Sequence, residues 1–139
     1  MTKEVYKKIE GIFNVNRKEF DIVEIDRNVL LNATKLAKTE FHPAPIIALL
    51  EGYVENRKLK IGGLKMLSDE LDFTIDLPFA TNAVGSLQSH PEGGDFPEKH
   101  ELDFFDRTGG VHFILSNPYT TRNMKAFDRD GNKLNFFVR

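Results

Sequence analysis

The sequence predicts a single mixed α/β (α+β) domain in which helices flank a largely continuous β-sheet. Three observations lead to this fold class. Residues 20–25 alternate apolar and polar side chains, as a half-buried strand does. Apolar residues then recur with helical period through residue 40. Residues 46–50 form a continuous apolar run that is typical of a central strand buried on both faces.

The first half of the domain is predicted to form a strand, a helix and a hairpin. Asp26 can cap a helix that runs through Glu40 and ends at the following His-Pro-Ala-Pro segment, because proline cannot continue it. The buried apolar strand comes next, and residues 59–67 form its neighbour across the polar turn at 55–58. Residues 69–82 give no regular pattern and are expected to be irregular.

The second half contributes another strand, a helix and the closing strands. Residues 83–89 are predicted to be a strand, and a glycine-containing loop at 92–95 follows. Asp95 and Glu98 have capping-box spacing around a proline that a first helical turn tolerates, so we expect a helix up to about Arg107. Three strands then close the domain, at residues 111–115, 123–127 and 134–138.

Residues 1–19 form an N-terminal extension to the domain at 20–139. Tyr6, Ile9 and Phe13 recur at helix-like spacing in this extension. We therefore expect a short amphipathic arm that packs on the domain.

Composition and charge exclude several classes of function. A net charge of −2 with dispersed lysines and arginines argues against nucleic-acid binding. No apolar run approaches the ~20 residues of a membrane span, and the first 20 residues lack the apolar core of a secretory signal. The absence of cysteine removes disulfides, thiol nucleophiles and cysteine zinc sites. We expect a cytoplasmic protein that binds neither nucleic acid nor membrane.

The segment from Gly85 to Pro91 has the layout of a zinc hydrolase site in which most of the chemical groups are replaced. Residues two apart on a strand share a face, so a His-x-His pair at positions 88 and 90 could hold one zinc ion. Here the pair is Gln88 and His90, and an amide is a poor zinc ligand compared with imidazole. Metal binding therefore depends on which other partners His90 has.

This segment and its surroundings resemble the JAMM (MPN, or Mov34/PAD-1) domain family, especially its small prokaryotic, archaeal-type members. The resemblance covers residues 20–139, and the order of elements agrees throughout. The residues that carry it lie at 42–52, 85–91, 97–105, 110–119 and 126–131. It implies a mixed sheet flanked by helices, a layout that also resembles zinc cytidine deaminases. Those enzymes need cysteine ligands, which this chain lacks.

The resemblance also implies a site. Active family members are zinc-dependent isopeptidases that cut ubiquitin-like modifiers from lysine side chains. In them two histidines and an aspartate hold zinc, a glutamate handles the proton of the zinc-bound water, and a serine helps to stabilise the tetrahedral intermediate. In this sequence the glutamate position falls on Pro45. The two histidine positions fall on Gln88 and His90. The serine position falls on Glu98, and the aspartate position falls on Glu101. Of these, His90 alone is kept, and Ser89 lies between the two histidine positions.

These residues have both functional and structural interpretations. Glu40 is near enough in sequence to replace the missing glutamate, and Glu101 could bind zinc if its longer side chain is accommodated. Alternatively, Glu98 is the last residue of the capping box, and Glu98 and Glu101 form a salt-bridged cluster with His90 that fills the metal pocket. His100 would point about 100° away from Glu101.

Two hypotheses on function follow. The favoured one is a non-catalytic protein-binding or scaffold module without a cofactor, whose partner is a ubiquitin-like modifier, another MPN-type subunit or a second copy of the chain. The alternative is a zinc-dependent isopeptidase or metallopeptidase with a rearranged site of His90, Glu101 and either Glu98 or Glu40. His42 and His112 are expected to be structural under both hypotheses.

Overall fold

The computed structural model describes residue 13 and residues 15–67 and 83–139. Residues 1–12 and 14 of the predicted N-terminal extension and the irregular segment at 69–82 lie outside these described residues. Phe13 and Val15 are both buried against the domain. The division at residue 20 stays a prediction.

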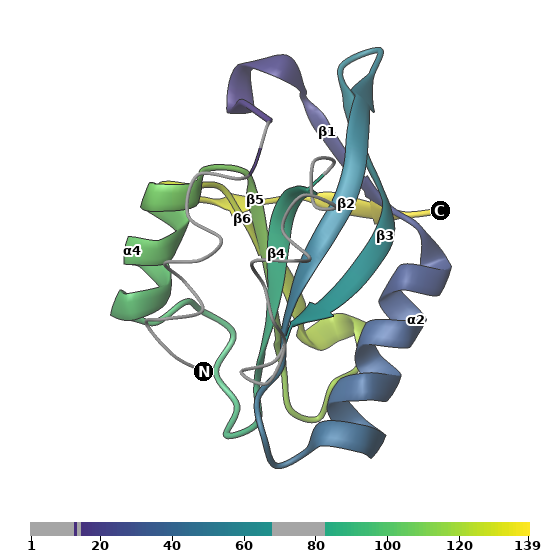
Figure 1. Ribbon diagram of the computed structural model, residues 1–139, viewed down its shortest axis with the longest axis vertical. Helices are drawn as coiled ribbons and strands as arrows, with labels where there is room; N and C mark the ends of the chain where they lie inside the picture. The colour runs from purple at the N-terminus through teal and green to yellow at the C-terminus, as the bar shows by residue number, and fades with distance from the viewer. Residues whose placement is uncertain (1–12, 14, 68–82) are drawn as a thin grey trace.

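A single mixed β-sheet forms the centre of the molecule (Figure 1). The strand order is β7-β6-β5-β4-β2-β3-β1-β8. β4 runs parallel to β5, and β1 runs parallel to both β3 and β8, whereas the other pairs are antiparallel. This confirms the predicted fold class. The strand bounds are β1 Ile22–Ile25, β2 Ile47–Glu55, β3 Lys58–Leu67, β4 Ala83–His90, β5 Val111–Ser116, β6 Met124–Phe127, β7 Lys133–Leu134 and β8 Phe136–Val138.

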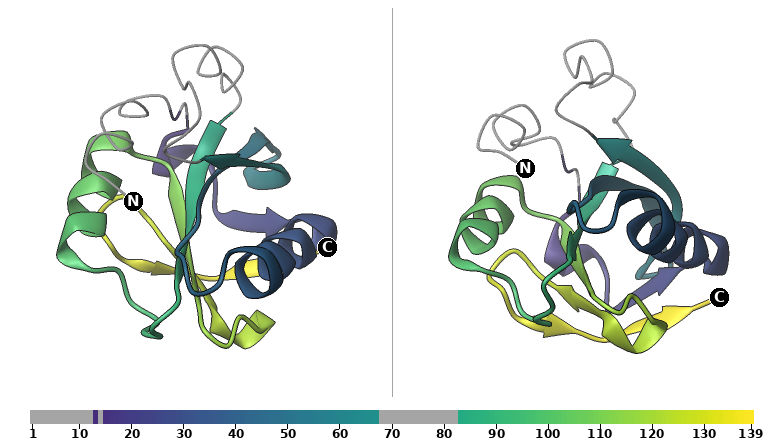
Figure 2. Two further views of the ribbon diagram at one scale, coloured as in Figure 1. Left: turned by 60° about the horizontal axis from the view of Figure 1, so that its bottom comes forward. Right: turned by 90° about the horizontal axis from the view of Figure 1, so that it is seen from below.

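Two longer helices cover opposite faces of the sheet (Figures 1 and 2). As predicted, Asp26 caps the first, where its carboxylate accepts a hydrogen bond of 2.7 Å from the Asn28 N–H. The helical elements are α2 Arg27–Lys35, its π-helical continuation η2 Leu36–Phe41, α4 Lys99–Thr108, and the short 3₁₀ turns η1 Arg17–Glu19 and η4 Thr121–Asn123. Among the described residues, no helix is both long and apolar enough to span a membrane.

The core has one apolar cluster on each face of the sheet. On one face, α2 contributes Val29, Leu30 and Ala33 to the larger cluster. On the other, α4 contributes Phe104 and Phe105. Alternate residues of the central strands supply the two clusters, as the two-residue repeat of a strand requires. The sheet is therefore fixed from both sides, and the ends of β2 and β4 beside α4 are held rigidly.

The last predicted strand and the second helix differ from expectation. Residues 134–138 were predicted to be one strand, but Leu134 pairs with β6 and residues 136–138 pair with β1. These partners lie at opposite edges of the sheet, so the twisted sheet brings its two edges close enough for one segment to reach both. The predicted helix after the glycine loop begins at Lys99, later than Asp95 and Pro97 indicated.

Candidate functional site

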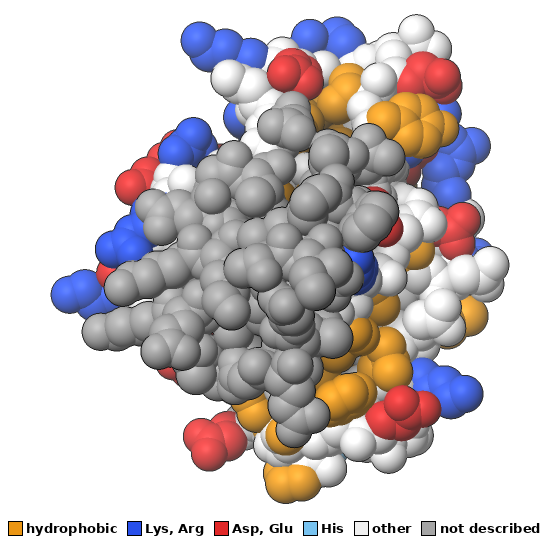
Figure 3. Space-filling model, in the orientation of Figure 1, with side chains coloured by type: hydrophobic (Ala, Val, Ile, Leu, Met, Phe, Trp, Pro, Cys, Tyr) orange, Lys and Arg blue, Asp and Glu red, His pale blue; other side chains and the backbone are white. Residues whose placement is uncertain are grey.

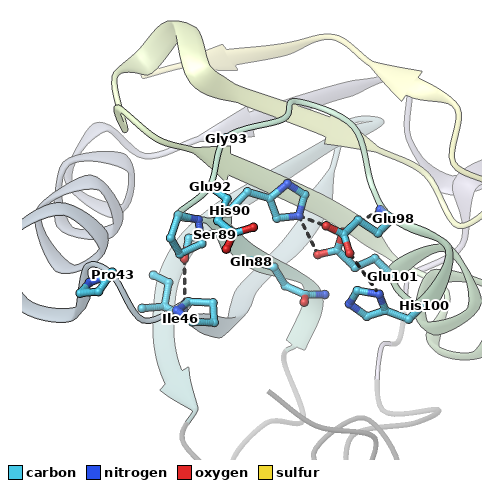
Figure 4. Close-up of a pocket in the computed structure, with 12 residues that line it drawn as sticks. Pro43, Ile46, Gln88, Ser89, His90, Glu92, Gly93, Glu98, His100 and Glu101 are labelled. Atoms are coloured by element: carbon cyan, nitrogen blue, oxygen red, sulfur yellow. Dashed lines mark hydrogen bonds and ion pairs between the residues drawn. The ribbon is translucent and has the colours of Figure 1, made fainter.

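A pocket of about 260 Å³ lies where the end of β4 meets the start of β2 and the first turn of α4 (Figure 4). The six positions singled out from the sequence all line it: Pro45, Gln88, Ser89, His90, Glu98 and Glu101. β4 brings Gln88 and His90 to the same face because they are two residues apart. The structure thus gathers every one of these residues at one place.

His90 and Glu101 form the centre of the pocket. The Nε2 atom of His90 lies 2.8 Å from Oε1 and 2.9 Å from Oε2 of Glu101, and its Nδ1 lies 2.8 Å from the carbonyl oxygen of Gly94. A carbonyl oxygen only accepts, so Nδ1 carries a proton, and the carboxylate favours a proton on Nε2 as well. The ring therefore donates from both nitrogens, and Figure 4 shows the two contacts with Glu101.

The charge state of His90 follows from these contacts. Burial by itself would lower the pKa of His90. The hydrogen bonds with Glu101 and the Gly94 carbonyl, together with the negative charges of Glu101 and Glu98, outweigh burial and raise this pKa above its ordinary value. This direction favours a charged imidazolium beside the Glu101 carboxylate.

Glu101 has a second role at the start of α4. Its Oε1 also accepts a hydrogen bond of 2.8 Å from the backbone N–H of Glu98, which is the N-cap residue. The capping role was predicted for Glu98 with Asp95, and it falls on Glu101 with Glu98 because the helix begins three residues later. Asp95 instead accepts a hydrogen bond of 2.8 Å from the Ser116 hydroxyl.

Ser89 and Pro45 are fixed by the start of β2. The hydroxyl oxygen of Ser89 accepts a buried hydrogen bond of 2.7 Å from the backbone N–H of Ile46. This bond ties the two strands together beside Pro45, which lines the pocket at the position where the resemblance places a glutamate. A proline side chain has no group that can carry a proton, so Pro45 contributes only shape and apolar surface.

The remaining acidic candidates lie at the rim or elsewhere. Glu98 has a side chain that is 68% exposed, and its Oε2 is 3.5 Å from Nδ1 of His100. His100 was expected to point away from Glu101, yet it lines the pocket beside Glu98. Glu40 lies on a different groove, between α2 and β3, and does not line the His90 pocket. Glu40 is therefore not placed to supply the proton-carrying group that Pro45 lacks.

The segment 116–119 fixes both walls of the pocket, a role that the sequence analysis did not assign to it although the resemblance includes these residues. The Asn117 side chain donates a hydrogen bond of 2.9 Å to the Pro91 carbonyl, and the Tyr119 hydroxyl lies 2.8 Å from Nδ1 of His42. With the bond from Ser116 to Asp95, this segment holds the loop after β4 and the loop before β2. Its partners are more than 20 positions away in the chain, so no local sequence signal marks them.

Replacement of Glu101 tests the importance of this carboxylate for the fold. Glu101→Gln places an amide donor against an imidazole donor, so we expect a loss of about 1–3 kcal/mol in the free energy of unfolding, measured by urea denaturation at pH 7. Glu98→Gln makes the same chemical change at an exposed position and is expected to cost less than about 0.5 kcal/mol. Equal losses in the two variants would contradict this role of Glu101.

Comparisons with known proteins find one curated relative and several solved structures that are similar to this chain. No family model matches the sequence. A "probable metalloprotease" from Haloferax volcanii is 36% identical over 110 residues, and the match spans 68% of this chain and 66% of the relative. The match therefore leaves about a third of that relative uncovered.

Solved structures give the same picture. The structure described as "JAMM: A Metalloprotease-like Zinc Site in the Proteasome and Signalosome" is 26% identical with a TM-score of 0.68, over 86% of this chain and 99% of the other. A JAB1/MPN domain protein from Archaeoglobus fulgidus is 26% identical with a TM-score of 0.67, over 84% and 96%. A protein from Desulfitobacterium hafniense, at 13% identity and a TM-score of 0.68, covers 85% of this chain and 93% of its own and shares the fold.

Proposed function

Because this chain belongs to the JAMM/MPN domain family, we propose that it is a non-catalytic member, a protein-binding or scaffold module that holds no catalytic zinc. One observation carries the proposal. Nε2 of His90, the one nitrogen that the family pattern retains for zinc, is hydrogen-bonded to both carboxylate oxygens of Glu101. An imidazolium ring has no lone pair to offer a metal, so this pair replaces the metal as the link between β4 and α4.

The donor set does not fit a catalytic zinc ion. Such a site needs three protein ligands and one open position for water. Within residues 15–67 and 83–139, no three histidine, aspartate or glutamate side chains are arranged to hold a metal ion. The partner of His90 on the strand is the buried amide of Gln88, a weak zinc ligand. Only His90 and Glu101 remain as a facing pair.

The groups that would carry the chemistry are also replaced. Pro45 lines the pocket in place of a proton carrier, and Glu98 stands at the position of the hydroxyl that would help to stabilise an oxyanion. A carboxylate repels a developing negative charge, so Glu98 opposes this role. These two replacements support a binding role for the domain.

We propose a protein as the partner, either another MPN-type subunit, a second copy of the chain or a ubiquitin-like modifier, in the cytoplasm. The support is the likeness to a site described in the proteasome and signalosome, and the absence of cysteine, which suits a reducing compartment. Hydrogen bonds from residues 116–119 to the loops on both sides hold the walls of the pocket, which supports a pocket built by the protein alone.

A second candidate function is a zinc-dependent metallopeptidase with a rearranged site. It is favoured by the relative described as a probable metalloprotease and by the direct contact of His90 with Glu101, two side chains that could share a metal after deprotonation of the ring. It requires further ligands from outside this pair.

Metal analysis separates the two functions. Protein purified without added zinc, then incubated with zinc and desalted, is expected to contain far less than one equivalent by mass spectrometry. A chelator is expected to leave Tm unchanged, because only a ligand bound to the native state raises stability. Stoichiometric zinc together with cleavage of an isopeptide-linked model substrate would establish the metallopeptidase instead.

A further inference from the structure

Within the part of the chain that the structure describes, one half of β3 pairs with a strand on one side. β2 pairs with β3 along its whole length, from Lys58 to Leu67. β1 pairs only with residues 58–61, because Asp26 ends the strand and caps α2. Among the described residues, the stretch 62–67 of β3 has no second strand beside it.

The register shows which backbone groups face this free edge. Gly63 lies opposite Glu51, and a β-bulge at Gly62 separates this pair from the earlier part of the ladder. Glu55 and Lys58 flank a two-residue turn, so their backbone groups form a hydrogen-bonded pair. Every second residue pair along an antiparallel ladder is hydrogen-bonded in the same way. After the bulge, residues 63, 65 and 67 therefore bond to β2. The N–H and C=O groups of Leu64 and Met66 point the other way.

These groups face a groove of about 480 Å³ between β3 and α2. Its apolar lining comes from Val29 and Leu36 on the helix and Leu64 and Met66 on the strand, and polar side chains such as Asn32 form its rim. The α2 residues that line this groove belong to the helix at the right of Figure 1. Figure 3 shows apolar side chains at the surface beside the lower turns of α2, bordered by charged residues.

We propose that this free edge of β3 binds an extended segment of a partner protein as an additional strand. Outward backbone groups two residues apart repeat at about 7 Å, which matches the backbone of an extended chain. The distance from Gly62 to Met66 accommodates about five residues of such a chain. In the bound segment, the residues that face α2 are apolar, because they pack on Val29, Leu36, Leu64 and Met66. The residues that alternate with them are polar.

The position of α2 selects a single peptide segment over a whole sheet. The helix lies directly beside the free half of β3, so the edge of a folded sheet from a second copy would meet α2 before it reached Leu64. The groove of about 480 Å³ between helix and strand is the space that a single extended segment would enter. The groove shares no lining residue with the His90 pocket. This inference therefore adds a second partner surface to the proposed function. The result of the metal analysis leaves it unaffected, because that analysis concerns the His90 pocket.

Peptide titration of the full chain tests this surface. The probes are acetylated and amidated pentapeptides with Val, Leu, Phe or Tyr at positions one, three and five and threonine at the others. We expect at least one to shift the amide resonances of residues 62–66 in a saturable way and to slow hydrogen exchange of the Leu64 and Met66 amides. N-methylation of one alternate set of peptide amides is expected to weaken binding at least about tenfold, and methylation of the other set to have little effect.

Two adjacent variants of α2 provide a matched control. Asn32→Trp fills the groove from its exposed rim and is expected to abolish the shifts, whereas Leu31→Trp, on an exposed side chain outside the groove, is expected to leave them intact. The proposal is wrong if no peptide shifts these resonances at millimolar concentration, or if both methylated forms bind as well as the parent. Slow exchange of the Leu64 and Met66 amides in the free chain would also overturn it, because the edge would already be covered.

Discussion

The double variant Gln88→His, Glu101→Asp is expected to bind one equivalent of zinc, whereas we expect the natural chain to bind far less. At a free zinc concentration of about 100 times the Kd, binding stabilises the folded state by about 2.7 kcal/mol. For a domain of this size, that gain corresponds to a rise of roughly 10 °C in Tm. Zinc content by mass spectrometry and Tm with and without a chelator measure the effect.

The geometry of the pocket accounts for this gain. Position 88 shares a face of β4 with His90, so an imidazole there adds a second nitrogen ligand on the same side. Glu101 reaches Nε2 of His90 with both oxygens and also caps α4. An aspartate at 101 is one methylene shorter, so it releases the ring from this ion pair and leaves Nε2 free to bind metal.

Two control variants make the result interpretable. Gln88→His alone keeps the Glu101 carboxylate on His90, so we expect it to bind zinc more weakly than the double variant. Adding His90→Gln to the double variant removes the retained ligand and is expected to return the zinc content to the level of the natural chain. If the double variant binds no more zinc than the natural chain, the replaced ligands are not what excludes the metal.

The parts of the fold that local patterns determine were predictable from the sequence. Asp26 caps α2 as expected, because its short carboxylate satisfies the first free N–H groups of a helix regardless of the rest of the chain. The split between β7 and β8 was not predictable. Leu134 pairs with β6 and Phe136 pairs with β1, because the twist of the sheet brings its two edges near each other. No local pattern within residues 134–138 indicates this change of partner strand.

The candidate site shows the same division. Strand periodicity placed Gln88 and His90 on one face, and the resemblance brought Glu101 to the same pocket. The capping prediction failed because tertiary contacts, which local sequence preferences do not reveal, engage Asp95 and move the helix start to Glu98. Ser116 takes Asp95 as its hydrogen-bond partner, so the helix begins later. Such long-range bonds leave no periodic trace in the sequence.

His112 gives the largest expected dependence of stability on pH. It is fully buried, stacks on Phe105 at 4.0 Å and lies 2.7 Å from the Ser86 hydroxyl. Its Nε2 donates a hydrogen bond of 2.6 Å to the Gly109 carbonyl. Burial lowers the pKa of His112 to about 3; the Gly109 bond opposes this shift and the positive charge of Arg129 adds to it.

The direction of the effect follows from proton binding in the two states. The unfolded chain binds a proton at this histidine below pH 6.5, whereas the folded chain does so only near pH 3. Acidification within this range therefore favours unfolding, by about 1.4 kcal/mol for each pH unit and about 5 kcal/mol in all. A loss of this size is comparable with the whole stability of a small domain. We expect the protein to unfold near the acidic end of the range.

Variants at position 112 separate this effect from the titration of carboxylates. His112→Phe keeps the stacked ring and cannot be protonated, and His112→Gln keeps a donor for the Gly109 carbonyl. Both should be less stable than the natural chain at pH 7, because buried polar partners or ring contacts are lost. Between pH 6.5 and 4 the difference should shrink by about 1.4 kcal/mol per pH unit in urea denaturation, since only the natural chain loses the histidine contribution. A difference that stays constant over this range would show that His112 is protonated in the folded core.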